Sequence, residues 1–387
     1  MKKLSLYIHI PFCEVKCGYC DFYSVPRGHG EFNLQREYVE QLVREIDQRS
    51  SETSPDGGRS QVLSLFFGGG TPSLLEPHLL EKILKTLQRH FSWDDRTEIT
   101  LESNPKTVSR EKLSAFRALG INRLSVGVQS FQDRFLKVMG RIHSGDEARK
   151  TIDDARKAGF DNMSLDLIYA LPGQVFEDWR QDLEEALSLE TPHISAYHLT
   201  IEEGTSFETL YKKGRLRLPE EEVGLQCLTW TRDRLCQARR EAYEISNFSL
   251  PGFESVHNRN YWHYGEYLGV GAGAASFMRK ENGPTYGRRR NNVRDLKRYL
   301  EGHWEGSHED ISLPTAMGEF CMLGLRTREG IRDQDFADAF GKSLSEVFTE
   351  PILDSMKKGW LESYQKGWRL TSEGILFSNE VAASFLP

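Results

Sequence analysis

Three cysteines lie close together near the start of the chain, in the stretch PFCEVKCGYCDF. Cys13, Cys17 and Cys20 have the spacing C-x3-C-x2-C, which can bring three thiolates to one metal centre. A structural zinc site needs a fourth ligand, which His29 could supply. An iron–sulfur cubane held by three cysteines keeps one iron open for an outside ligand. The spacing therefore favours a [4Fe-4S] cluster.

The elements around this loop alternate between strand-like and helix-like patterns over the first 200 residues. Six β/α repeats in a row imply parallel strands joined by right-handed crossovers. Such strands could form a barrel or an open doubly wound sheet; we predict an α/β fold in which residues 1–205 form a partial (β/α)6 barrel. The predicted strands are 4–10, VLSLFFGGG, 98–103, 123–130, 162–173 and 193–200, and the predicted helices are 33–48, 78–91, 109–118, 132–139, 145–158 and 176–189.

After residue 205 the pattern becomes more helical and more aromatic. We predict a linking region at 206–311 and a mostly helical module at 312–387. In that module, helices at 316–325, 333–340 and 345–358 and then a hairpin follow the order of a winged helix. Eight Lys and Arg stand against eleven Asp and Glu there, so we expect this module to pack rather than to read DNA.

Polar and glycine residues recur where the predicted strands end. The carboxyl ends of parallel strands share one rim, so these residues should surround one ligand site. They are Gly68 to Thr71, Glu102, Gln129, Asp166, Tyr197 and His198. Taken singly, Gln129 or Asp166 could equally be a strand-end cap.

Composition narrows the classes of partner. The chain has 387 residues, 38% of them hydrophobic and 28% charged, and a net charge of −7. This acidic balance disfavours general binding to nucleic acid or to anionic membranes. The six cysteines do not form a disulfide framework, which favours a reducing cytoplasm, and MKKLSLYIHIPFC is expected to be mature protein rather than a signal.

The stretch YIHIPFCEVKCGYCDF resembles the radical S-adenosylmethionine (SAM) superfamily, in which a CxxxCxxC loop follows the first strand of a partial barrel. The resemblance implies that Cys13, Cys17 and Cys20 hold a [4Fe-4S] cluster whose open iron chelates SAM. It also implies an electron donor, because the reduced cluster cleaves SAM to a 5′-deoxyadenosyl radical. The barrel would position and shield these cofactors.

Further motifs narrow the resemblance to the branch that holds the oxygen-independent coproporphyrinogen III oxidases and a group of haem chaperones. These motifs are GGGTPS, LESNP, GVQSF, MGRIHS and LDLIYALPGQ. Carried over by position, the implied SAM contacts are Tyr7, Tyr19, Gly69, Gly70, Thr71, Glu102, Gln129, Arg141 and Asp166. Carboxylates and amides can bond the ribose hydroxyls, and Arg141 can pair with the SAM carboxylate.

A second group of residues suits a tetrapyrrole. HNRNYW, which begins at His257, matches the HNxxYW motif of the chaperones, whose histidine is associated with haem binding; the resemblance thus implies His257 as a haem ligand. Imidazole is a standard axial ligand of haem iron, and Tyr261, Trp262 and Tyr267 could form an aromatic wall. From the residues alone, a structural role for His257 stays open, as does ligation by other histidines, namely His9, His193 or His198. The arginines at 288–290 could meet propionates or form a solvated turn.

The position two residues after the third cysteine separates the two groups. The pattern of the oxidases resembles CxxxCxxCxC, with a fourth cysteine two positions after the third. This chain has Phe22 at that position. The resemblance therefore implies a cytoplasmic haem chaperone, with coproporphyrinogen III decarboxylation as the disfavoured alternative. The implied partners are haem, apo-haemoproteins such as membrane-bound respiratory enzymes, and an electron donor, with no nucleic acid.

Overall fold

Six parallel strands form the centre of the main sheet. The computed structural model describes residues 3–26, 31–53, 58–280 and 284–387. The six strands are β1 (Lys3–Ile10), β4 (Ser60–Gly69), β6 (Glu98–Ser103), β7 (Arg123–Gln129), β8 (Asn162–Tyr169) and β9 (His193–His198). Each pairs in parallel with the next, in chain order. The predicted order of strands is confirmed.

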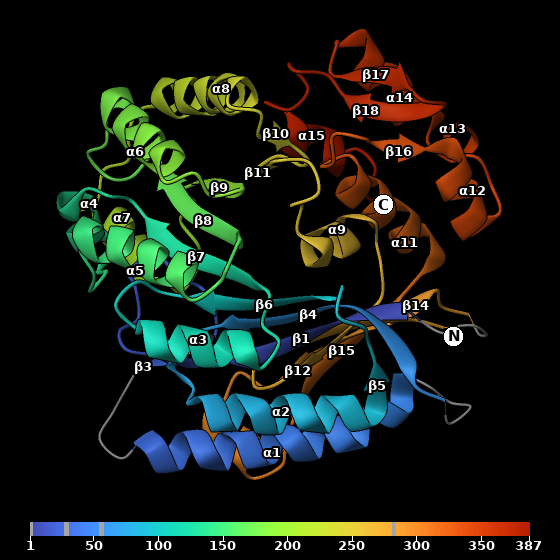
Figure 1. Ribbon diagram of the computed structural model, residues 1–387. Helices are drawn as coiled ribbons and strands as arrows, with labels where there is room; N and C mark the ends of the chain where they lie inside the picture. The colour runs from blue at the N-terminus through green and yellow to red at the C-terminus, as the bar shows by residue number, and fades with distance from the viewer. Residues whose placement is uncertain (1–2, 27–30, 54–57, 281–283) are drawn as a thin grey trace.

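Helices join these strands and cover the outer face of the sheet. They are α1 (Glu31–Thr53), α2 (Pro77–His90), α3 (Arg110–Ala118), α4 (Asp133–Met139), α5 (Gly145–Lys157) and α6 (Phe176–Ser188). Figure 1 shows α1 and α2 side by side along one face. In α2, Leu80, Ile83 and Leu87 are buried because residues three and four positions apart share one helical face. Shorter elements in this half are β2 (Phe12–Cys13), β3 (Val25–Pro26), the 3-10 helix η1 (Pro72–Leu74) and β5 (Phe91–Ser92).

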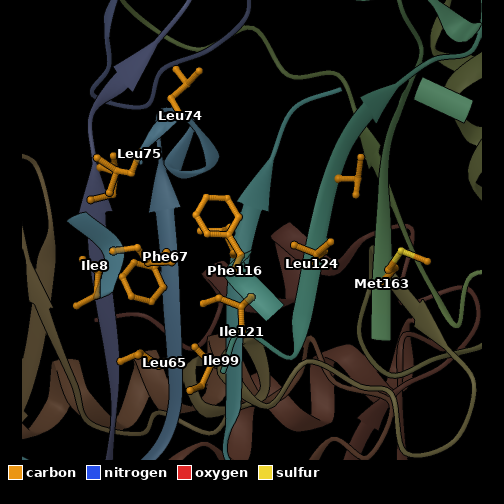
Figure 2. Close-up of a cluster of buried hydrophobic side chains, with 14 of the residues drawn as sticks. Ile8, Leu65, Phe67, Leu74, Leu75, Ile99, Phe116, Ile121, Leu124 and Met163 are labelled. Carbon is orange, nitrogen blue, oxygen red and sulfur yellow. The ribbon is translucent and has the colours of Figure 1, made fainter. Parts of the chain in front are cut away.

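The main hydrophobic core lies between the strands and these helices. Ile8, Leu65 and Phe67 from β1 and β4 meet Phe116 from α3 in this core (Figure 2). Every residue of β7 is buried, as expected for a parallel strand covered on both faces. Full burial of one such side chain contributes about 1.5–3 kcal/mol, so the core holds the strand ends in fixed positions.

The barrel stays open between its first and last strands. In the part of the chain that the structure describes, β1 pairs on its second edge with β12 (Tyr267–Val270), and β9 pairs with β11 (Asn247–Ser249). From β12 the sheet continues antiparallel through β13 (Ala275–Arg279), β14 (Gly287–Asn292) and β15 (Glu305–Ile311), and beyond β11 lies β10 (Glu241–Ala242). The predicted partial barrel is therefore confirmed.

The strands from β10 to β15 were not predicted. Four-residue β12 is too short to show a period, and β14, with the sequence GRRRNN, has no apolar alternation. The helices of this region are α7 (Ser206–Lys212), α8 (Glu221–Gln237), α9 (Val256–Trp262) and α10 (Leu296–Leu300). Strands between residues 206 and 311 extend the main sheet. The predicted domain boundaries at 205 and 311 remain predictions.

The C-terminal segment has a hydrophobic core of its own, which includes Phe336, Ile352 and Phe385. The hairpin that the sequence predicts here is present, and a third short strand joins it in a small sheet. The predicted helix 345–358 is split at Phe348. The elements are α11 (Leu313–Gly324), β16 (Ile331–Arg332), α12 (Asp333–Phe340), α13 (Leu344–Val347), α14 (Thr349–Lys357), β17 (Leu361–Tyr364), β18 (Gly367–Leu370) and α15 (Ser378–Ala383).

Candidate functional site

The carboxyl ends of the central strands surround a cavity of about 500 Å³, called the barrel cavity below. It lies at the rim where the sequence placed a ligand site. The predicted site residues that line it are Cys13, Cys17, Tyr19, Cys20, Gly69, Gly70, Thr71, Glu102, Gln129, Arg141 and Asp166. Tyr7 and His257, which the resemblance also implied, are not among its lining residues, and neither is Gly68 from the strand-end set.

Cys13 ends the short strand β2, Cys17 and Cys20 lie on the loop that follows it, and none of the three forms a disulfide. The Cys13 Sγ lies 3.4 Å from the Thr71 Oγ1, and the Cys17 Sγ lies 3.7 Å from the Arg141 Nη1. Burial raises the pKa of Cys13 and that of Cys20, the latter to about 11, so both thiols stay protonated until a cation displaces the proton.

This donor set fits an iron–sulfur cluster better than a single ion. Among the residues with described positions, no three His, Cys, Asp or Glu side chains could hold one metal ion. In a cubane each thiolate binds a different iron, so the sulfurs stand farther apart than around one ion. The Arg141 guanidinium beside Cys17 adds a positive charge that suits an anionic cluster. His29, the alternative zinc ligand, lies outside the described residues.

The glycine run at the end of β4 forms a cradle that a β-carbon would fill. A β-carbon on Gly68 would stand 2.9 Å from the rings of Tyr7 and Phe66, and one on Gly70 would stand 2.6 Å from the carbonyl oxygen of Phe12. Gly69 adopts a φ of +111°, which favours glycine. Glycine is therefore required here for close packing against the neighbouring strand and loop, and Gly69 and Gly70 line the barrel cavity.

One side-chain network fixes the cationic wall of the barrel cavity. Asn104 Nδ2 donates to Thr71 Oγ1 at 2.8 Å, and Arg141 Nη2 donates to Asn104 Oδ1 at 2.6 Å. Arg141 Nη2 also donates to the Gly127 carbonyl. Sequence reasoning missed Asn104, although it lies in the LESNP motif. Its role depends on contacts to residues 33 and 37 positions away.

Two carboxyl groups face the cavity and accept hydrogen bonds from different donors. Asp166 accepts hydrogen bonds from Ser125 Oγ at 2.7 Å and Ser164 Oγ at 3.0 Å. Glu102 Oε2 accepts one from the Gly69 N–H at 3.1 Å. Burial, together with the charge of Asp166, raises the pKa of Glu102 to about 8. At neutral pH Glu102 therefore holds a proton, which a cationic ligand would displace.

Gln129 ends β7 in a left-handed conformation with a φ of +67°. The pairing of β7 with β8 shifts register just before it, between Val126 and Gln129. Non-glycine residues rarely adopt this conformation, and such strain clusters at functional sites. Here the backbone turn brings Gln129 to the cavity wall.

The two remaining predicted site residues lie behind the cavity wall. The Tyr7 hydroxyl is 3.2 Å from His9 Nδ1, and its ring stacks on Phe66. His257 is 1% exposed; its Nδ1 lies 2.9 Å from Ser64 Oγ and its Nε2 lies 2.9 Å from the Tyr261 hydroxyl. Burial lowers the pKa of His257 to about 3, so the ring is neutral.

These contacts bear on the prediction that His257 ligates haem, which stays a prediction. Both ring nitrogens are engaged, and ligation would require one of the two bonds to break. His9 and His193 likewise bond through both nitrogens inside the protein. His198 lines the barrel cavity. The arginines at 288–290 are not in a solvated turn but in β14, where each pairs with carboxylates.

Comparison with known proteins places the chain in a family. Residues 7–186 match the Radical SAM superfamily, and residues 311–377 match the HemN C-terminal domain. The heme chaperone HemW of Bacillus subtilis (strain 168) is 35% identical over 99% of both chains. The chain belongs to the HemW family of the radical SAM superfamily. HemW of Escherichia coli (strain K12) is 34% identical over 99% of this chain and 98% of its own.

Two further relatives extend the comparison. The bovine protein named Radical S-adenosyl methionine domain-containing protein 1, mitochondrial, is 33% identical over 100% of this chain and 88% of its own. The structure of coproporphyrinogen III oxidase HemN from Escherichia coli superposes with a TM-score of 0.83 at 22% identity, over 99% of this chain and 90% of that one. HemN therefore shares the fold.

Membership of the HemW family confirms the predicted cofactors, a [4Fe-4S] cluster and SAM. The three free thiols and the glycine cradle fit these two groups. Within the described ranges, no helix is both long and apolar enough to cross a membrane.

Proposed function

We propose that the chain is a haem chaperone, which binds haem and passes it to apo-haemoproteins. Relatives similar over the full length are named heme chaperones. Phe22 carries the choice against an oxidase: its side chain is 59% exposed and lines the barrel cavity two positions after Cys20. The sequence pattern of the oxidases of this branch, as the resemblance gives it, has a fourth cysteine at that position. A phenyl ring can neither ligate iron nor exchange a proton.

In this proposal Cys13, Cys17 and Cys20 hold the cluster, and Arg141 balances its charge. When bound, the reduced cluster and SAM supply one-electron cleavage of the SAM sulfonium. The glycine cradle bonds the ligand through backbone groups. The remaining proposed contacts orient SAM; they are Tyr19, Thr71, Glu102, Gln129 and Asp166 on the cavity wall and Tyr7 behind it.

His257 enters the proposal as a positioning residue for the haem-binding segment. Its ring joins α9 to β4 through Ser64 and stacks on Phe66 at 4.8 Å. The buried carboxylate of Glu98 accepts hydrogen bonds from the Val256 and His257 N–H groups, which fixes the start of the same helix.

The acceptors of the haem would be apo-haemoproteins such as membrane-bound respiratory enzymes, and a separate donor would reduce the cluster. The net charge of −7 supports docking to specific proteins over adsorption to anionic lipid. Six cysteines without a disulfide support a cytoplasmic location.

Mass analysis of the tetrapyrrole after one anaerobic reaction tests this function. Reconstituted protein receives SAM, a strong reductant and coproporphyrinogen III, and a parallel sample receives haem. We expect unchanged porphyrinogen and haem that stays with the protein through gel filtration. Loss of two carboxyl groups from the porphyrinogen would identify an oxidase instead.

A further inference from the structure

A second hollow lies between α9 and the C-terminal module, with a volume of about 900 Å³; it is called the module groove below. Figure 1 shows α9 between the main sheet and this module. The groove is larger than the barrel cavity and is not part of it. Its volume falls within the range of roughly 300–1,000 Å³ that is usual for small-molecule and cofactor sites.

The side chains of this groove suit a flat apolar ligand with carboxylate groups. Trp262, Phe320 and Tyr364 supply aromatic surface. Arg259 and Arg332 supply positive charge and pair with Glu329 at 3.5 Å and with Asp335 at 2.7 Å. These carboxylates are on the surface, so an incoming propionate could share or replace them at small cost.

His263 is the imidazole of this groove. It directly follows α9, its residue is exposed, and its ring forms no hydrogen bond with any residue whose position is described. It differs in this from His257, whose nitrogens are both engaged. Partial desolvation of the ring and the charge of Arg259 lower the pKa of His263, so the ring is neutral at pH 7 and has a lone pair for a metal.

The barrel cavity is a poorer place for the same ligand. It has about 500 Å³, and the cluster and SAM must already share that volume. His198 lines it, but a β-carbon on Gly224 of α8 would lie 2.8 Å from the His198 Nε2, so α8 is packed closely against this ring. The module groove combines more volume, a free imidazole and cationic side chains.

We propose that the module groove is the haem site of this chain and that the His263 imidazole ligates the haem iron. The inference rests on the proposed chaperone function and names the site at which the cargo is held. Ligation forms one bond from a ring nitrogen to iron, with no change of oxidation state. The propionates pair with the arginines at the rim, and the macrocycle lies against the aromatic side chains.

The position of His263 also gives the HNxxYW segment a physical role. His257 fixes α9 to the sheet, while Arg259, Trp262 and His263, farther along, face the groove. The motif histidine would therefore position the ligand rather than be the ligand.

Haemin titration of the reconstituted full-length protein tests this assignment. Soret absorbance gives the affinity, and electron paramagnetic resonance at saturation gives the ligation state of the iron. We expect His263→Ala to weaken haemin binding at least tenfold and to change the spectrum. Added imidazole should restore the wild-type spectrum in His263→Gly. His303→Ala, at an exposed position outside both cavities, should match the wild type.

His257→Gln separates positioning from ligation. We expect a lower melting temperature and an unchanged spectrum once haemin is saturating. An unchanged affinity and spectrum in His263→Ala, with the cluster absorbance intact, would overturn the site and leave the chaperone function standing. Wild-type protein that does not retain haemin would overturn both.

Discussion

The barrel cavity takes its polar side chains from the ends of neighbouring parallel strands, and most of them bond to one another. Arg141, Asn104 and Thr71 form one such chain of contacts. The module groove is assembled from α9, the end of β13 and segments more than 50 residues beyond α9, and its cations Arg259 and Arg332 pair with exposed carboxylates. The first site is rigid before a ligand arrives, whereas the second can rearrange around one.

This difference matches what each site would hold. Cofactors that stay bound gain from a fixed arrangement, because no side chain has to be ordered on binding. A cargo must leave, and surface ion pairs worth about 0–1 kcal/mol each are easily exchanged. A chaperone that retains its cofactors and releases its cargo therefore gains from a rigid cofactor site and an adaptable cargo site.

The largest expected effect is loss of the cluster in Cys17→Ser. Two thiolates are left for a cubane that needs three, so iron content and cluster absorbance should fall to near background. Haemin affinity should stay within about twofold of the wild type if the two sites are separate. Cys236→Ser is the control, because Cys236 is exposed on α8 away from the cavity. Parallel loss of haem and cluster would put both ligands in one cavity.

A smaller loss is expected from Asn104→Ala. The change removes the partner of Arg141 Nη2 and of Thr71 Oγ1, and a broken buried hydrogen bond costs about 1–3 kcal/mol. SAM affinity, measured by calorimetry on reconstituted anaerobic protein, should fall roughly tenfold or more. Asn291→Ala, at the exposed position of β14, should leave it unchanged. Equal affinities for both variants would mean that the network does not orient SAM.

A third expected effect is on pH dependence and concerns Glu102. Its pKa is about 8 in the folded protein against an ordinary value of 4.5, so between these limits the folded state holds a proton that the unfolded state has lost. Stability contributed by Glu102 is present below pH 4.5 and is lost as pH rises through 8. Glu102→Gln should flatten this fall, by a few kcal/mol at most, since one pKa unit is about 1.4 kcal/mol.

Urea unfolding of the metal-free protein at pH 5, 6.5 and 8 measures this fall. Glu329→Gln, in the module groove, should keep the wild-type pH dependence, because its carboxylate is on the surface. A wild-type curve as flat as that of Glu102→Gln would show that Glu102 is ionised throughout.

The central fold was predictable because buried parallel strands are nearly continuous apolar runs and their helices are amphipathic. The strand-end rule likewise gathered most of the barrel cavity from the sequence. Tyr7 and His257, which only the resemblance implied, lie behind the wall; the position of His257 depends on how α9 packs against β4, whose Ser64 is 193 residues away. His263 was missed for the same reason: the groove exists only once the C-terminal module is in place.

The short helix α9 contacts both ligand sites. Asn258 lines the barrel cavity, whereas Arg259 and His263 line the module groove. If a ligand in one site shifts this helix, the shift therefore changes the free energy of ligand binding in the other site. Thermodynamic reciprocity then fixes the size: the factor by which SAM alters haem affinity equals the factor by which haem alters SAM affinity. Bound haem would thus change the affinity of the chaperone for SAM, and SAM binding could in turn control when haem is released.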